Sequence, residues 1–346
     1  MTGAVVAATS RRRGWVVAGA LAAVAVVGAA DRRDLVAAAR GLGHLDPTAG
    51  ALLLLSSVVL MGVLVARHRA AHRALGVPLP VGAVTRASLT AQFVNSVSKS
   101  GGVAGVTAFV VEGRRHGGRR SLTIAAYLLV VVMDQLAFAL VLAVAMTVLV
   151  VHGRFESPEL VATAVFAVYV AATVALVVTA VRSRTAVRAV CALPGRCAAW
   201  ASTTLLRRPR VHRRDDTRAD ELHDAFVIAG SRGPAALRIL APALAVDLVC
   251  ALQLWLALAA LGVSTGPTAP LVAYAVGTLF ATVGFLPGGI GLVEISSTAV
   301  LHSFGVPLGA ALAAVVCARI VEFWIPLTVG AFAARRYLAR SEGVLA

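Results

Sequence analysis

Ionisable side chains interrupt the long apolar stretches of this sequence, and their types suit the binding of charged groups. They are Lys99, Asp134, Asp247, Glu294, Arg319 and Glu322, with Gln92, Asn95 and Gln135 as uncharged polar companions. The chain is 59% hydrophobic with a mean hydropathy of +0.86, so these stretches are expected to lie in a membrane. Ionisable groups are costly in hydrocarbon and usually mark a functional site there.

The spacing of these residues predicts contacts between them. Arg319 and Glu322 lie three residues apart, so they share a helix face and can pair. Glu294 follows a glycine-rich segment, where a helix is expected to begin, and a carboxylate in a first helical turn is favoured by the helix dipole. The free amides of such a turn can instead receive a phosphate or another anion, assisted by Lys99.

A purely structural role is the alternative. Glu294 would then cap its helix and neutralise Arg319, with Glu322 completing a buried network, because polar groups also join helices within membrane bundles. For Glu294, Arg319 and Lys99 taken together, we favour a binding site. For Asp247, and for Asp134 with its neighbour Gln135, both interpretations stay open.

Two glycine pairs break the apolar pattern at corresponding places. Gly101-Gly102 and Gly288-Gly289 are separated by an offset of 187 residues, from position 101 to position 288. Each pair lies within a predicted helical hairpin, at about 81–111 and 270–302. Broken segments at matching positions of two halves indicate a midplane binding site. The predicted binding residues are Asn95, Lys99, Gly101, Gly102, Asp134, Pro287, Gly288, Gly289, Gly291, Glu294, Arg319 and Glu322.

Apolar runs of suitable length predict the membrane spans, which lie at about 14–30, 48–66, 121–151, 158–181, 235–261 and 307–334. The run at 14–30 also resembles a cleavable signal peptide, although an uncleaved span is favoured. The predicted fold class is an all-α polytopic membrane protein. It has about six full spans plus two broken, re-entrant-type helical hairpins in two inverted repeats.

Arginine clusters predict the orientation of a single integral membrane domain, 1–346. Its parts are a first span and outer loop (1–47), a first repeat (48–151), a span with an Arg-rich cytoplasmic loop (152–234), a second repeat (235–338) and a short cytoplasmic tail (339–346). Clusters including Arg67, Arg69 and Arg73 are placed in the cytoplasm, as are both termini. The net charge of +16 therefore indicates topology in a plasma membrane and contact with anionic headgroups, not nucleic acid.

Signatures of catalysis are missing from the sequence. The four cysteines form no Cys-x-x-Cys pair and join no histidine cluster, so neither a metal site nor a disulfide framework is expected. No nucleophile elbow, phosphate-binding loop or His-Glu-x-x-His motif occurs. We therefore expect no cofactor and no enzymatic activity.

The pattern Pro-Gly-Gly-x-Gly-x-x-Glu, from Pro287 to Glu294, is followed by Cys317-Ala-Arg-Ile-Val-Glu-Phe-Trp324. Over residues 48–338 the chain resembles the lysylphosphatidylglycerol synthase transmembrane family. This is the flippase-like membrane part of the multiple peptide resistance factor, which is also found as stand-alone proteins. The resemblance implies a lipid-handling protein whose central cavity is lined by Pro287, Gly288, Gly289, Gly291, Glu294 and Arg319. The first half departs from the family pattern, because Val103-Ala104-Gly105 stands where many members carry an acidic residue.

These observations lead to two functional hypotheses of different classes. The favoured one is a lipid translocator for a polar or anionic lipid, with aminoacylated, glycosylated and polyprenyl-phosphate lipids as candidate cargo. The alternative is a membrane glycosyltransferase, or an accessory subunit of lipid-linked sugar assembly. A structural membrane partner without transport is a third interpretation. The expected partners are membrane lipids and a separate lipid-modifying enzyme.

Overall fold

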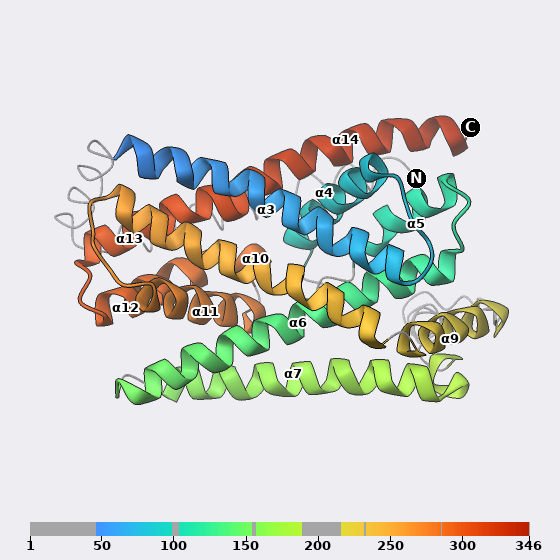
Figure 1. Ribbon diagram of the computed structural model, residues 1–346, viewed down its shortest axis with the longest axis horizontal. Coiled ribbons are helices and arrows are strands. Elements are labelled where there is room, and N and C mark those ends of the chain that lie inside the picture. The colour runs from blue at the N-terminus through green and yellow to red at the C-terminus, as the bar shows by residue number, and fades with distance from the viewer. Residues whose placement is uncertain are drawn as a thin grey trace, which may run out of the picture.

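The computed structural model describes residues 46–98, 104–153, 157–188, 216–231, 233–284 and 286–345 (Figure 1). Within these ranges the regular structure is helical and no strand occurs. The predicted span at 14–30 lies outside the described residues, as do Lys99, Gly101 and Gly102.

Two groups of helices share one order of elements. The first comprises α3 (Pro47–Ala74), α4 (Val81–Val97), α5 (Val106–Arg115) and α6 (Arg120–Val151). The second comprises α10 (Gly233–Ala260), α11 (Thr268–Val283), the 3-10 turn η1 (Pro287–Gly289), α12 (Leu292–Ser303), α13 (Leu308–Arg319), the π-turn η2 (Ile320–Trp324) and α14 (Ile325–Leu345). Between the groups lie α7 (Ser157–Arg182) and α9 (Asp216–Ser231).

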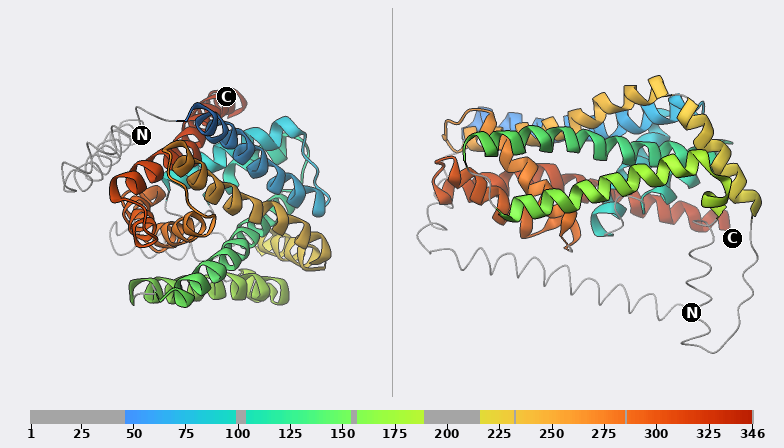
Figure 2. Two further views of the ribbon diagram at one scale, coloured as in Figure 1. Left: turned by 60° about the vertical axis from the view of Figure 1, so that its left-hand side comes forward. Right: turned by 90° about the horizontal axis from the view of Figure 1, so that it is seen from below.

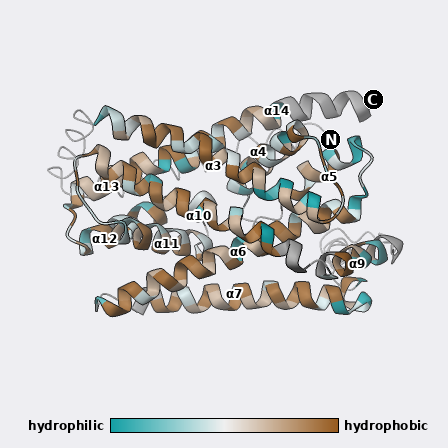
Figure 3. Cartoon of the chain, in the orientation of Figure 1, coloured by the Kyte–Doolittle hydropathy of each residue, from teal (hydrophilic) through white to brown (hydrophobic). Residues whose placement is uncertain are grey.

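Five helices in the described part of the chain are long and apolar enough to cross a membrane: Pro47–Ala74, Arg120–Val151, Leu160–Arg182, Leu237–Ala260 and Leu308–Arg335. They confirm the prediction of an all-α polytopic membrane protein. Large apolar side chains stand exposed along α7, including Val161 and Val168, as expected of a surface that faces lipid (Figure 3).

The first of these helices corrects one sequence prediction. A span was expected at 48–66, with Arg67, Arg69 and Arg73 in a cytoplasmic cluster after its end, but α3 continues to Ala74. Alanine and arginine are strong helix formers, and no glycine or proline occurs between Ala66 and Gly76. The three arginines therefore project from a helix and not from a loop.

The two groups run in opposite directions. In Figure 1, α3 and α10 lie side by side and antiparallel, with the hairpin α4–α5 at one end of the molecule and the hairpin α11–α12 at the other. Each hairpin packs against the last long helix of the other group, α4 against α14 and α11 against α6. Figure 2 shows α7 alongside this bundle, where it contacts α11. The arrangement is the one expected of inverted repeats.

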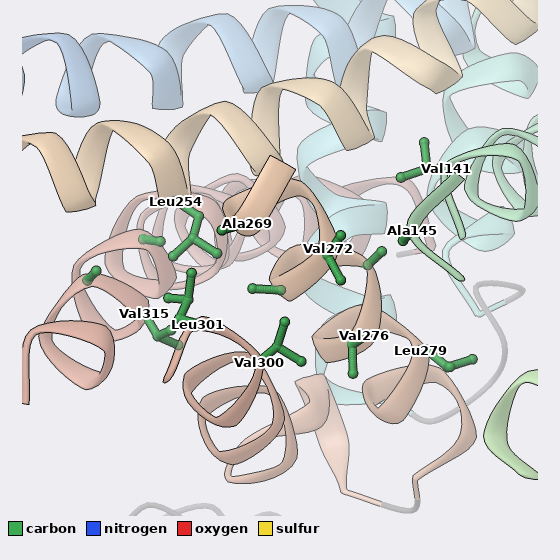
Figure 4. Packing of buried hydrophobic residues seen from close by; sticks show 14 of the residues in the cluster. Val141, Ala145, Leu254, Ala269, Val272, Val276, Leu279, Val300, Leu301 and Val315 are labelled. Atoms are coloured by element: carbon green, nitrogen blue, oxygen red, sulfur yellow. The ribbon is translucent and has the colours of Figure 1, made fainter. Parts of the chain in front are cut away.

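Small residues allow close packing between the helices of the largest buried cluster (Figure 4). Ala257, Ala273 and Ala311 are fully buried there. At Gly277, an added methyl group would collide with Ser297, whose hydroxyl donates to the Ala273 carbonyl at 2.9 Å. The hairpin α11–α12 is therefore held together by close backbone approach.

A proline explains the interruption between α13 and α14. Pro326 has no N–H to donate to the preceding turn, and the helix widens there into the π-turn η2. The Val321 carbonyl accepts a hydrogen bond from the Ser57 hydroxyl at 2.9 Å instead. This turn places Glu322 and Phe323 beside the cavities described below.

Candidate functional site

A cavity of about 760 Å³ lies between the two helix groups, a size typical of ligand sites. Its lining comes from α3, α4, α6, α7, α11 and the turn after α11. Ser98, at the end of α4, and Gly284, Gly288 and Gly289 all reach it. The cavity therefore lies where the two broken hairpins approach each other.

The second hairpin breaks where the backbone requires glycine. Gly288 and Gly289 both have a φ of 65°, and Gly291 has a φ of 86°. Residues other than glycine rarely adopt such positive values. An added methyl group at Gly288 would collide with the Phe323 ring, and one at Gly289 would collide with Ala281. The turn needs glycine for both its dihedral angles and its close contacts.

Arg319 stabilises this turn through hydrogen bonds. Its Nε donates to Glu294 Oε1 at 3.1 Å, its Nη1 to Glu322 Oε1 at 3.1 Å and its Nη2 to the Gly288 carbonyl at 2.7 Å. The Phe323 ring covers the guanidinium at 4.4 Å. The second oxygen of Glu294 accepts from the Gly291 amide at 2.7 Å, as a helix cap. The predicted pairing of Arg319 with Glu322 and with Glu294 is thus present.

The predicted residues of the second repeat separate into two sets. Gly288 and Gly289 line the central cavity, whereas Pro287, Gly291, Glu294, Arg319 and Glu322 are not among its lining residues. Arg319 and Glu322 line a neighbouring cavity of about 200 Å³. The two cavities share Gln92, Ala281 and Phe323 as lining residues, so they adjoin.

Asn95 organises the break of the first hairpin and lines the central cavity. Its amide nitrogen donates to the Tyr127 hydroxyl at 2.9 Å, and its oxygen accepts from the Gly105 backbone amide at 2.8 Å. An added methyl group at Gly105 would collide with Tyr127 and Ala91. The asparagine therefore joins the end of α4 to the start of α5.

Asp134 also lines the central cavity. It forms an ion pair that was not expected from the sequence. Arg67 Nη1 donates to Asp134 Oδ2 at 2.5 Å, with side-chain exposures of 13% and 30% respectively. Arg67 had been assigned to a cytoplasmic cluster. One signal could have found it: Leu60, Leu64 and Ala71 are spaced as the buried face of a helix, and position 67 falls on that face.

The polar lining of the central cavity comes mainly from the first repeat and α7. Arg67, His68, Ser88, Asn95 and Tyr127 belong to α3, α4 and α6, and Gln135 contacts Tyr169 of α7 at 3.4 Å. The second repeat presents its glycine turn, the Phe323 ring and one polar side chain, Thr282, whose hydroxyl donates to the Thr278 carbonyl. The two helix groups therefore contribute different kinds of side chain to the cavity, although they share one order of helices.

Two other buried carboxylates have structural partners. Asp247 accepts from the Tyr274 hydroxyl at 2.7 Å. Glu112, which is fully buried, accepts two hydrogen bonds from Arg86, each at 3.2 Å, and lies 3.6 Å from Arg115. Glu112 therefore ties α5 to α4, as the bond between Arg319 and Glu294 ties the end of α13 to α12. The sequence analysis did not identify this ion pair.

Outside the spans, α9 is fixed to the segment that follows α7. Arg188 forms a two-pronged ion pair with Asp220, with bonds of 2.8 and 2.6 Å, and Arg184 pairs with Asp224. The hydrogen bonds from Arg188 hold the pKa of the Asp220 carboxyl below its usual value. Within the described residues no group of His, Cys, Asp and Glu is placed to hold a metal ion.

Comparison with known proteins identifies the family. The model of the lysylphosphatidylglycerol synthase TM region matches residues 15–330, which is most of the chain, so the protein belongs to this membrane-protein family. A UPF0104 membrane protein of Methanothermobacter thermautotrophicus is 34% identical over 80 residues. That match covers 23% of this chain and 24% of the relative, so the chain aligns with about a quarter of that protein.

Proposed function

We propose that this member of the lysylphosphatidylglycerol synthase transmembrane family translocates a polar or anionic lipid between the two leaflets. The headgroup would pass through the central cavity while the acyl chains remain in the bilayer. Aminoacylated, glycosylated and polyprenyl-phosphate lipids are the candidate cargo. The lipid partner is the substrate of a non-enzymatic process, and a separate enzyme would modify it.

One observation carries the proposal: a cavity partly lined by polar and charged side chains lies between two oppositely directed helix groups, at the breaks of both hairpins. A charged headgroup cannot cross hydrocarbon unaided, and polar groups inside a helix bundle supply a path for it. The exposed apolar side chains of α7, which lines the cavity on one side, suit contact with acyl chains.

The proposal includes an orientation. Both termini and the arginine-rich connector would face the cytoplasm of a plasma membrane, because basic residues collect on that side. The hairpin α4–α5 would then approach the cavity from the cytoplasm, and the hairpin α11–α12 from outside. Alternating access would follow if the two repeats rock against each other.

A liposome assay tests the proposal with a blocked cavity. The purified chain is reconstituted, and the fraction of fluorescent phosphatidylglycerol that reaches the other leaflet is measured over time. Val165 lines the cavity from α7, whereas Val168 on the same helix is 69% exposed and does not line it. Val165→Trp should slow the movement strongly, and Val168→Trp should leave it unchanged.

The outcomes separate the functional classes. Equal rates for both variants, or no movement of any tested phospholipid or polyprenyl lipid by the wild-type chain, would contradict translocation. Transfer of a sugar to a polyprenyl-phosphate acceptor by the same purified chain would instead support the glycosyltransferase alternative.

A further inference from the structure

We propose that Arg67 is the anion-binding residue of the central cavity, and that Asp134 is a counter-ion which the phosphate of a lipid headgroup displaces. The inference rests on the proposed function, since it names the group that receives the headgroup. It assigns this role to a residue outside both glycine motifs.

Arg319 is not available for the same role. Its three nitrogens already donate to Glu294, Glu322 and the Gly288 carbonyl, and Phe323 covers its face. An anion that took over these three hydrogen bonds would release the turn that shapes the cavity wall. The side chain is also only 8% exposed. Arg319 therefore positions the turn. Among the described residues, Arg67 is the one arginine or lysine that lines the central cavity.

Arg67 has a hydrogen-bond donor that is not in use. Its Nη1 donates to Asp134, while its Nε is buried without a hydrogen-bond partner in the structure. Oδ1, the other oxygen of the Asp134 carboxylate, is buried without a hydrogen-bond partner as well. Buried polar groups normally have partners, and unpaired ones carry a large desolvation cost. The pair is thus incompletely satisfied on both sides.

The surroundings of the pair share this property. His68 and Ser88 line the same cavity, both are more than nine-tenths buried, and each has a polar atom without a partner. Arg67, His68, Ser88 and Asp134 come from three helices, and all four line the central cavity. A ligand that brings several hydrogen-bond acceptors would satisfy the donors among them.

A phosphodiester suits this chemistry best. Its two non-bridging oxygens can accept bidentate hydrogen bonds from a guanidinium, and such charge-assisted hydrogen bonds are among the strongest in proteins. Asp134 is 30% exposed, so on displacement it can be hydrated or can accept a donor from the same headgroup. In the empty state the Asp134 carboxylate neutralises the partly buried Arg67, and binding exchanges one anion for another.

The test measures binding and not transport. The full chain in detergent is titrated with fluorescent phosphatidylglycerol, and diacylglycerol with the same chains serves as the phosphate-free lipid. Arg67→Gln should weaken phosphatidylglycerol binding by about tenfold or more, and Asp134→Asn should strengthen it, because the competing carboxylate is gone. Arg73→Gln, on the exposed end of the same helix, should change nothing.

The double variant Arg67→Gln/Asp134→Asn controls for loss of binding that is caused by misfolding. Arg67→Gln alone leaves a partly buried carboxylate unpaired, whereas the double variant carries a neutral pair of similar size. A folded double variant that binds weakly supports the proposal. Wild-type affinity in either variant without Arg67, or no gain in affinity from Asp134→Asn, overturns it.

Two further comparisons identify the source of the phosphate and separate this inference from the proposed function. Binding of glycerol 1-phosphate that depends on Arg67, without binding of phosphatidylglycerol, would assign the site to a free phosphate compound and overturn the headgroup assignment. Lipid binding that depends on Arg67, without movement in liposomes, would contradict translocation alone. Movement that is unaffected by Arg67→Gln would contradict the present inference alone.

Discussion

Arg319 donates to the backbone carbonyl of Gly288 across 2.7 Å, although 31 residues separate them in the chain. The bond connects the end of α13 to a glycine whose φ is positive and whose neighbour in space is the Phe323 ring. The side chain and the strained turn therefore form one unit: the arginine satisfies the carbonyl, and the glycine leaves room for the ring.

The first prediction concerns the removal of this arginine. Arg319→Ala leaves Glu294 and Glu322 buried without their cation, which should lower the free energy of unfolding by about 3–5 kcal/mol. Arg319→Lys should cost less, since it keeps the charge but cannot donate in three directions. Thermal unfolding in detergent measures both. Arg335→Ala, at an exposed position of α14, is the control, and equal losses there would refute the assigned role.

The second prediction separates backbone strain from crowding. Gly288→Ala should destabilise the protein by about 1–3 kcal/mol through its positive φ, and by more because of the collision with Phe323. Gly291→Ala should show the strain alone, since no atom lies within 4 Å of its added methyl group. Gly62→Ala, in the middle of α3, should be neutral or stabilising by about 0.5–1 kcal/mol. Melting temperatures in that order would support this account of the turn, and a tolerated Gly288→Ala would refute it.

The third prediction concerns the first hairpin. Glu112 is fully buried and contacts both Arg86 and Arg115, whereas the Arg86 side chain is 44% exposed. Glu112→Gln should therefore destabilise the protein more than Arg86→Gln does, because Arg115 still neutralises the carboxylate after Arg86 is lost. The double variant should lose less than the sum of the two single variants. Additive losses in thermal unfolding would show that the two residues do not interact.

Much of the frame could be predicted from the sequence, because it depends on patterns that lie close together in the chain. Apolar runs gave the spans, and the two glycine pairs gave the hairpins. The contact of Arg319 with Glu322 follows from helical spacing, and the cap formed by Glu294 follows from its place after the glycines. Each of these features depends on residues a few positions apart.

The composition of the cavity could not be predicted in the same way. Arg67 and Asp134 are 67 residues apart, and only the packing of α3 against α6 brings them together. Arg67 was expected in a cytoplasmic cluster because of its neighbouring charges, but it lies within α3, which extends to Ala74. Likewise, the family resemblance implied that Glu294 and Arg319 line the central cavity, but they bond to each other, and Arg319 lines the neighbouring cavity instead. Which face of a helix a polar residue occupies depends on its neighbours in space.

The last prediction tests the opposed directions of the two hairpins. Arg115 ends α5, and Gly266 lies in the connection before α11, at opposite ends of the molecule (Figure 1). In a variant whose native cysteines are replaced, a single cysteine at position 115 should react with an impermeant maleimide only from the cytoplasmic side. A single cysteine at position 266 should react only from outside. The positive-inside rule assigns the sides, and the antiparallel course of α3 and α10 requires that they differ. Labelling of both positions from the same side of intact cells would contradict the inverted arrangement, and with it the path proposed for the headgroup.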